Sequence, residues 1–597
     1  MQIPYKNKKL ERILIGLNVG AAVLVVASFV ALFGFYQPLV QDHFLYATQL
    51  LLLTFFVIEK IIRTLNTESL KDYWRLNWFE LPTLLALIVV LLGRKFWFEA
   101  EQANTIAHMV VGAYLILQVV IKICRTTVTL AAMGQNPTRM LLASFVVLIV
   151  VGAGLLCLPR ATTGEDSLSF VDALFTSTSA ACVTGLVVKD TGQDFSFIGQ
   201  CVILTLIQLG GLGIVVFGAV FALLLGQAFS LRESAAMQDL LNTQTLNRLG
   251  NLLAFIFMAT LVIETLGALG LYHMWANDPA WQGGQHKLWY YSVFHSVSAF
   301  CNAGFGLFND SLMRYSHCSG IYLVICPLII LGGLGFSVLY NLCNVSTDRI
   351  RKSLLKLFNK RYRLNIAPPK RLTLQSKIVL TMSLGLIVLG TLVFMLMEYT
   401  TALSGEPVCA HPLDALFQSI TARTAGFNTV DIAHLTDASK LMTILLMVIG
   451  GSPGSTAGGI KTVTLAVILM SVFTTLRRRG EVEMFKRSVS VAVVGRALTV
   501  TLLFVVFLFA ITLTLMVTEK NNPQMMTDSD ILFEAASALG TVGLTTGITP
   551  HLSTAGRYVL IIAMLIGRLG PLTLVAALTI NTKPARYSYP QESLMVG

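Results

Sequence analysis

Charge is what this sequence has least of. Asp, Glu, Lys and Arg make up 12% of its 597 residues, whereas 55% are hydrophobic and the mean hydropathy is +0.72. No stretch leaves room for a sizeable soluble domain, and such a composition is typical of polytopic membrane proteins. An enzyme is not expected, because the apolar spans contain no clustered metal ligands and no plausible catalytic grouping.

Paired cysteines are missing as well. The nine cysteines include no C-x-x-C motif, which argues against a zinc site or a redox motif. Most of them are expected to be apolar core residues. Cys318 and Cys409 fall in loops expected outside the cell, so a disulfide between them is left open.

A complete phosphate-binding loop is also absent. The stretch GGSPGSTAGGIKT, residues 450–462, has Gly454 and Gly459 at the right spacing, but Ile460 separates the second glycine from Lys461. The apolar flanks of this stretch together reach a membrane-spanning length. Irregular backbone at that depth is tolerated only where it is buried in protein or lines water. We therefore expect a broken transmembrane helix that faces a pore or cavity.

The net charge of +12 does not indicate nucleic-acid binding, because the basic residues cluster in short loops. These loops are Lys6–Lys9, Arg349–Arg371, Arg477–Arg479 and Lys486–Arg487. Short basic loops of membrane proteins lie in the cytoplasm, so we expect both termini to be cytoplasmic and the protein to be multi-pass in the cell (inner) membrane.

Four segments share one pattern: a Phe, a Ser or Thr four residues later, an Ala, and then a Gly followed by Leu or Phe. The segments begin at Phe175, Phe294, Phe417 and Phe533. Their glycines, Gly185, Gly304, Gly426 and Gly543, are 119, 122 and 117 residues apart, which indicates an internal repeat. The short Phe-containing segments cannot cross a bilayer and are expected to be re-entrant. Each repeat then crosses twice, and four parallel repeats around one axis make a pore.

Glycine suits a cation filter because it allows the left-handed or extended backbone that turns consecutive carbonyls the same way. Backbone carbonyls can replace the hydration shell of a cation, and the C-terminal end of each short helix is partially negative. The alternative is that Gly, Ser and Thr here only allow close helix packing. That packing needs a small-x3-small helical face rather than four matched loops.

The motifs VTGL, NAGF, RTAGFNT and TVGLTT, with NPTRMLLASFVVLIVVGAGLLCLP before the first and residues 450–462 in the third repeat, resemble the Trk/Ktr/HKT superfamily of potassium transporters. The resemblance is nearest to bacterial Ktr/Trk membrane subunits and covers about Asn136 to Lys583. It implies an all-α polytopic membrane protein with four helix, pore-helix, helix (M1-P-M2) repeats around one pore.

The resemblance also implies the site residues. The selectivity filter would comprise Val183, Thr184, Gly185, Leu186, Asn302, Ala303, Gly304, Phe305, Thr424, Ala425, Gly426, Phe427, Thr541, Val542, Gly543 and Leu544. The gating loop would comprise Gly450, Gly451, Ser452, Gly454, Ser455, Thr456, Gly458, Gly459 and Lys461. Arg568 matches an arginine of the fourth repeat near that loop. Gly185, where some plant relatives carry serine, implies a preference for potassium over sodium.

The third repeat departs from the others. The shared Ser or Thr lies six residues before the glycine in three repeats, but Thr421 lies five before Gly426. We expect an imperfectly fourfold ring. Arg423 either braces the loop by hydrogen bonding to carbonyls or sits at the outer rim.

Three aspartates precede the filter segments. Asp172, Asp414 and Asp530 fall near the starts of the short helices. N-terminal capping is the preferred interpretation of these side chains. Ion binding is the alternative.

Residues 1–132 lie outside the resemblance and contain four apolar spans, near 14–35, 46–62, 78–92 and 106–123. The segment from Phe55 looks like part of a voltage-sensor-like bundle in which acidic and basic side chains pair. The fourth span lacks the arginine at every third position that gating charge requires. We expect an accessory four-helix transmembrane bundle with a structural role.

The pore repeats are placed at 133–245, 246–372, 373–490 and 491–597. The expected function is potassium uptake. The alternatives are a sodium-coupled or poorly selective cation transporter, and a membrane signalling protein with a nonconducting pore. The resemblance implies a homodimer and a cytosolic nucleotide-binding ring of the regulator-of-potassium-conductance type, with the nucleotide on that separate subunit. Potassium would be held by filter carbonyls, and no organic cofactor is expected in this chain.

Overall fold

The computed structural model describes residues 6–36, 40–70, 73, 80–97, 106–119, 121–122, 137–164, 167–213, 216–220, 249–278, 281, 284–316, 318–358, 370–398, 411–522 and 526–578. Among these residues, six helices are long and apolar enough to cross a membrane, or up to eight if each of two bent helix pairs is one span. The one two-stranded sheet in these ranges pairs β1 (Val482–Met484) with β2 (Arg487–Val489). The predicted all-α polytopic architecture is confirmed at this level.

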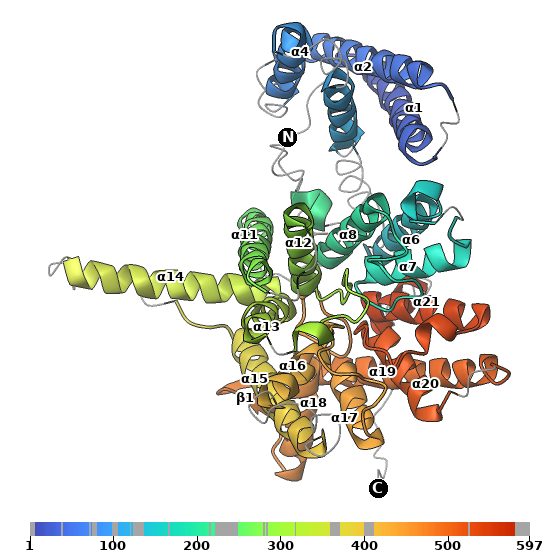
Figure 1. The fold of residues 1–597 in the computed structure, drawn as a ribbon. Helices are drawn as coiled ribbons and strands as arrows, with labels where there is room; N and C mark the ends of the chain where they lie inside the picture. The colour runs from blue at the N-terminus through green and yellow to red at the C-terminus, as the bar shows by residue number, and fades with distance from the viewer. Residues whose placement is uncertain are drawn as a thin grey trace.

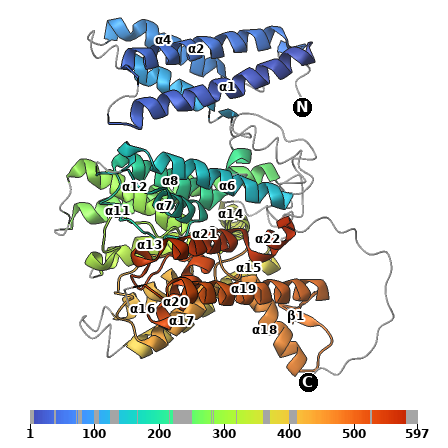
Figure 2. The same ribbon diagram turned by 90° about the vertical axis from the view of Figure 1, so that its right-hand side faces the viewer.

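The first helices form a bundle of their own, drawn in blue at the top of Figure 1. They are α1 (Lys8–Phe33), α2 (Asp42–Leu65), α4 (Glu80–Trp97) and a further helix, Ile106–Val119. Arg63 forms ion pairs with Glu11 at 3.0 Å and with Glu59 at 3.3 Å. Figure 2 shows the bundle next to the remaining chain. Its helices α1 and α2 run in roughly the same direction as α6 and α8.

After the bundle, a long helix, a short helix and a third helix that ends or breaks follow one another four times. The first group is α6 (Pro137–Leu156), α7 (Phe170–Cys182) and α8 (Phe197–Leu212), and the second is α11 (Leu249–Ala276), α12 (Gln285–Cys301), α13 (Ser319–Leu334) and α14 (Phe336–Phe358). The third is α15 (Leu374–Glu398), α16 (His411–Thr421), α17 (Asp437–Val448) and α18 (Thr462–Leu476), and the fourth is α19 (Val491–Thr518), α20 (Asp528–Gly540), α21 (Thr554–Leu569) and α22 (Pro571–Leu578). Figure 1 shows the four groups in chain order around a common centre.

The short helices are anchored by the aromatic residue that opens each motif. Phe175, Phe294, Phe417 and Phe533 are all fully buried. Ser169 caps α7 by accepting a hydrogen bond from a backbone amide of the first turn, and Thr527 does the same for α20. Burial of a large aromatic side chain in every group fixes these helices toward the centre of the molecule.

In three groups the helix that follows the short helix ends or bends at the same short motif. GGLG (210–213), GGLG (332–335) and GRLG (567–570) each end in a glycine with φ of 80 to 84°. α14 is turned by 104° from α13, and α22 by 96° from α21. In the third group an irregular segment, residues 449–461, separates α17 from α18 instead.

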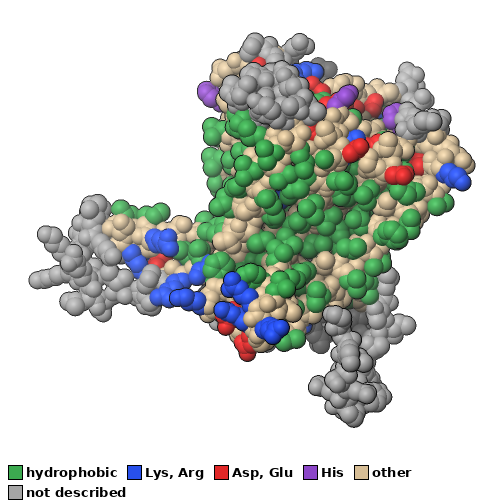
Figure 3. Space-filling view, turned by 90° about the horizontal axis from the view of Figure 1, so that it is seen from below, with side chains coloured by type: hydrophobic (Ala, Val, Ile, Leu, Met, Phe, Trp, Pro, Cys, Tyr) green, Lys and Arg blue, Asp and Glu red, His purple; other side chains and the backbone are tan. Residues whose placement is uncertain are grey.

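Charge is distributed asymmetrically over the surface. Figure 3 shows Lys and Arg gathered along one edge, Asp, Glu and His along the opposite edge, and a hydrophobic zone between them. The exposed basic side chains of residues 477–487 are Arg477, Arg478, Arg479, Lys486 and Arg487. An apolar belt between polar edges is the surface that a bilayer requires.

Candidate functional site

Each of the four short helices ends at one of the loops singled out in the sequence. The sixteen predicted filter residues lie in these loops, and all are buried except the half-buried Gly304. The glycines Gly185, Gly304, Gly426 and Gly543 have φ of 94, 70, 80 and 92°. Two residues earlier, Val183, Asn302, Thr424 and Thr541 also have positive φ. Two left-handed residues at the same spacing give the four loops a common backbone course, which glycine adopts without steric cost.

The four glycines close a ring. A Cβ atom on Gly185 would come within 3.0 Å of the carbonyl oxygen of Ala303, and one on Gly304 would do the same at Ala425. A Cβ on Gly426 would likewise approach the carbonyl oxygen of Val542, and one on Gly543 that of Thr184. Because Thr184 belongs to the first loop, the four contacts form a closed ring. Each glycine therefore lies against the carbonyl that precedes the next glycine, and there is no space for a side chain at any of the four positions.

The shared Ser or Thr of each motif ties its loop to the short helix. Ser179 Oγ accepts from the amide of Gly185, and Ser537 Oγ accepts from the amide of Gly543, both at 3.1 Å. In the other two loops the hydroxyl donates instead to the carbonyl that follows the glycine. These bonds join Ser298 to Phe305 at 2.7 Å and Thr421 to Phe427 at 2.6 Å.

The third loop leaves its helix earlier than the others. α7, α12 and α20 continue three residues past the shared Ser or Thr, whereas α16 ends at Thr421 itself. Arg423 lies in the turn that follows, and its side chain is buried, with 9% of the residue exposed. Its buried Nε has no hydrogen-bond partner among the described residues. Bracing of the loop and a place at the outer rim both stay predictions for Arg423.

A depression of about 260 Å³ opens beside the ring. Gly426 and Gly543 line it together with two carboxylates, Asp310 and Asp431. Asp310 pairs with Arg314 at 3.4 Å, and Asp431 contacts His434 at 2.8 Å. Carboxylates at the mouth of a narrow site raise the local concentration of cations.

The residues predicted as a gating loop form the irregular segment between α17 and α18. Gly450, Gly451, Ser452, Thr456 and Gly458 are buried, Ser455, Gly459 and Lys461 are half-buried, and Gly454 is exposed. The segment folds back on itself, because the amide of Gly450 donates to the Ile460 carbonyl at 3.0 Å and that of Thr462 to the Gly451 carbonyl at 3.0 Å. Lys461 Nζ donates to the Ala457 carbonyl at 2.6 Å.

The same segment reaches the second and fourth groups. The amide of Ser452 donates to the Gly333 carbonyl at 3.0 Å, and the amide of Phe336 donates to the Gly454 carbonyl at 3.1 Å, both at the break between α13 and α14. A Cβ on Gly458 would strike Thr541 of the fourth loop. The segment therefore lies directly against one loop of the glycine ring.

Arg568 connects this segment to the first group. Its Nη1 donates to the Thr456 carbonyl and its Nη2 to the Gly210 carbonyl and, at 3.1 Å, to the Gly211 carbonyl. The side chain starts from α21 and ends on the last turn of α8. The half-buried Arg568, whose guanidinium donates to three carbonyls, cross-links the first, third and fourth groups.

The capping interpretation of the aspartates is wrong for Asp172 and Asp530. Ser169 and Thr527 are the caps, and the aspartates lie in the first turn. Asp172 forms an ion pair with Arg557 of α21, and Asp530 pairs with Lys440 of α17 at 3.1 Å.

Asp414, in the first turn of α16, likewise contacts another group. It accepts hydrogen bonds from Tyr322 of α13 and, at 2.9 Å, from Thr429. All three aspartates therefore connect a short helix to the group before it around the centre.

Sequence reasoning missed Glu264. Its carboxylate, within α11, accepts from Gln208 Nε2 at 3.3 Å, and the thiol of Cys301 lies 3.5 Å from Gln208 Oε1. Cys301 directly precedes the second filter loop. The available signal was a single acidic residue in a long apolar span, since intramembrane carboxylates are rare unless they serve a function.

The proposed disulfide is not tested at both ends. Cys318 Sγ donates to Asp278 at 2.9 Å. Cys409 lies outside the described residues. The pairing of these two cysteines stays a prediction.

Comparison with known proteins identifies the family. The TrkH family of cation transport proteins matches residues 107–588. The chain is 38% identical over 470 residues to the Ktr system potassium uptake protein B of Bacillus subtilis, covering 77% of this chain and 97% of that protein. It is 35% identical over 465 residues to the potassium/sodium uptake protein NtpJ of Enterococcus hirae, covering 77% and 97%.

A solved structure supports the fold. The crystal structure of the potassium transporter TrkH from Vibrio parahaemolyticus matches with a TM-score of 0.57 and 17% identity, covering 85% of this chain and 99% of that one. The chain is thus a multi-pass membrane protein of the TrkH family of cation transport proteins, within the Trk/Ktr/HKT superfamily of transporters.

Proposed function

We propose that this protein takes up potassium across the cell membrane through a pore at the centre of the four groups of helices. The observation that carries the proposal is the closed ring in which the carbonyls of Thr184, Ala303, Ala425 and Val542 lie against successive glycines. Inward-facing carbonyls can replace the hydration shell of a potassium ion. Relatives at 35–38% identity are named as potassium uptake proteins.

In this proposal the four groups are M1-P-M2 repeats, with boundaries at 133–245, 246–372, 373–490 and 491–597. The sixteen loop residues form the filter. Residues 1–132 form an accessory, voltage-sensor-like bundle of four transmembrane helices. In the same proposal the basic edge faces the cytoplasm, and both termini are on the cytoplasmic side.

The segment 450–461 is proposed as the gate beneath the filter. Lys461 and Arg568 place two positive charges there, and both hold carbonyls of this segment. Cations in a narrow passage repel potassium electrostatically, and carbonyls bound by them are unavailable to the ion. Opening therefore requires the segment to leave Arg568.

A homodimer and a cytosolic nucleotide-binding ring are also proposed as partners. Three of the relatives are named as proteins of a Ktr system. The exposed basic residues near β1 and β2 offer a positively charged surface for such a partner.

The test is growth at low potassium and rubidium uptake in a transport-deficient bacterium. Wild type should restore both, with the candidate regulatory ring co-expressed if the chain alone does not. Gly185→Ser should lower uptake and increase inhibition by sodium, because residue 185 has φ of 94° and no room for a Cβ. Gly154→Ser is the matched control, since nothing lies within 4 Å of a Cβ at that position of the first repeat.

Deletion of Ser455–Gly458 should raise rubidium uptake, because it removes the Thr456 carbonyl that Arg568 holds. Well-expressed wild type that moves no rubidium with its partner present would contradict the pore proposal. A second candidate, a poorly selective cation transporter, is favoured by the name of the potassium/sodium relative. Equal sodium and rubidium uptake by wild type would support it.

A further inference from the structure

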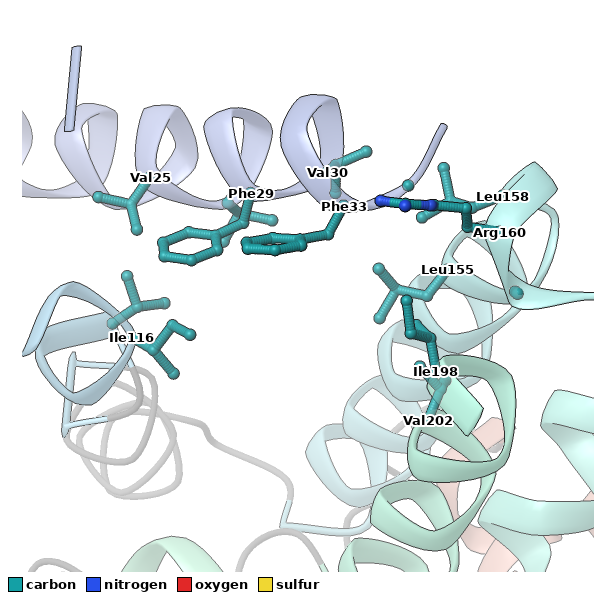
Figure 4. A pocket seen from close by; sticks show the side chains of 14 residues that line it. Val25, Phe29, Val30, Phe33, Ile116, Leu155, Leu158, Arg160, Ile198 and Val202 are labelled. Carbon is teal, nitrogen blue, oxygen red and sulfur yellow. The ribbon is translucent and has the colours of Figure 1, made fainter. Parts of the chain in front are cut away.

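A cavity of about 410 Å³ lies between the N-terminal bundle and the first repeat. Figure 4 shows Val25, Phe29 and Phe33 of α1 on one side of it, and Leu155 and Val202 on the other. Apart from Arg160 the lining side chains are all apolar. Its volume falls within the range of about 300–1,000 Å³ that small-molecule sites occupy.

Arg160 lies at one end of this cavity. Its backbone amide donates to the Gly34 carbonyl at 3.1 Å, and Figure 4 shows its side chain extending toward Phe33. Among the residues that the structure describes, no carboxylate pairs with its guanidinium. Arg314 and Arg557, two other arginines near the loops that precede or follow the short helices, pair with Asp310 and Asp172.

The level of Arg160 corresponds to a membrane–water interface. The apolar helices α1 and α6 end at Phe33 and Leu156, just before this level. Tyr36, which is 55% exposed, lies there too and donates to the Thr162 carbonyl at 3.1 Å. Tyrosine at the ends of spans marks the depth of lipid headgroups, whereas Val25 and Val202 lie deeper along the helices.

We propose that this cavity binds one phospholipid, with an acyl chain between α1 and α8 and its phosphate on the Arg160 guanidinium. The apolar lining fits a hydrocarbon chain, and an arginine to which the described part of the chain supplies no carboxylate partner complements a phosphate at headgroup depth. The lipid joins the bundle to the pore repeats beside the two hydrogen bonds at Gly34 and Tyr36. The inference that a lipid binds here does not depend on the proposed potassium uptake.

The test is native mass spectrometry of the full-length protein after delipidation, titrated with phosphatidylglycerol and with diacylglycerol carrying the same chains. Wild type should bind one phosphatidylglycerol about tenfold more tightly than diacylglycerol, because only the former offers a phosphate to the arginine. Arg160→Gln should remove this preference. Val202→Trp should abolish binding of both, because the indole fills the cavity.

Arg314→Gln is the matched control and should bind like wild type, since its arginine is paired and does not line the cavity. Equal binding of the two lipids by wild type would overturn the role of Arg160. Unchanged lipid binding by Val202→Trp would overturn the proposal that the acyl chain lies in this cavity. If Val202→Trp does not fold, Arg160→Gln and the lipid comparison still decide.

Discussion

The loop ring and the helix breaks differ in how regularly the four groups of helices build them. In the loop ring, all four groups place left-handed residues at the glycine and two positions before it. At the breaks, three groups share a glycine with φ of 80 to 84°, while the third has the irregular residues 449–461 instead. That irregular segment contacts the second group at Gly333 and the fourth at Arg568.

The difference follows from what each region has to do under the proposed function. A dehydrated ion needs oxygen ligands on all sides, so every repeat must present the same backbone. A passage can be closed by one obstacle, so a single repeat suffices for the gate. Changes in the ring should therefore act on permeation and selectivity, and changes at the break should act on opening.

The largest effect is expected from crowding the ring. Gly543→Ala forces φ of 92° on a residue with a Cβ and pushes that Cβ into the Thr184 carbonyl. A distortion of about 3 kcal/mol corresponds to a loss of roughly 100-fold in rate, measured as rubidium uptake at equal expression.

Gly547→Ala tests the effect of backbone strain from a positive φ without a steric clash of the new Cβ. Gly547 also has φ of 92°, but nothing lies within 4 Å of a Cβ there. Its uptake should stay within a few-fold of wild type. Equal losses in both variants would mean that the ring is not the site of permeation.

A smaller effect, of opposite sign, is expected at the break. Arg568→Gln removes the charge-assisted bond that holds the Thr456 carbonyl, and such a bond is typically worth about 1.5–3 kcal/mol. Rubidium uptake should rise about tenfold, with the rubidium-to-sodium ratio unchanged because the ring is intact.

Arg568→Lys keeps the charge and should lie between wild type and Arg568→Gln. Reduced uptake with normal expression would contradict the proposal that the bond from Arg568 to Thr456 keeps the pore closed. A changed rubidium-to-sodium ratio would show that the break also affects selectivity.

What could be predicted from the sequence follows the same division. The glycines of the ring could be predicted because a backbone with positive φ favours glycine. Their nearly constant spacing along the chain showed that the four positions correspond to one another. The partners of the aspartates were not visible, because Arg557 is 385 residues from Asp172 and carries no local signal. Ser169, three residues before Asp172, was a local capping signal that the capping interpretation overlooked.

Glu264 shows the same limit in a helix. The lone carboxylate in α11 could be recognised as unusual. Its contacts with Gln208 of α8 and Cys301 of α12 depend on how three helices pack. Periodicity along one helix does not contain that information.

The smallest effect is expected from the links between neighbouring repeats. Asp172→Asn or Arg557→Gln should each lower the apparent melting temperature in detergent by about 2 °C, and the double variant by no more than either, because the two side chains share one interaction. Tyr291 occupies the position in the second group that Asp172 occupies in the first. Among the described residues, no hydrogen bond of its hydroxyl is found. Tyr291→Phe should therefore leave the melting temperature unchanged. Additive losses in the double variant would mean that Asp172 and Arg557 act separately, and the ring would then be held by packing of the short helices rather than by these polar links.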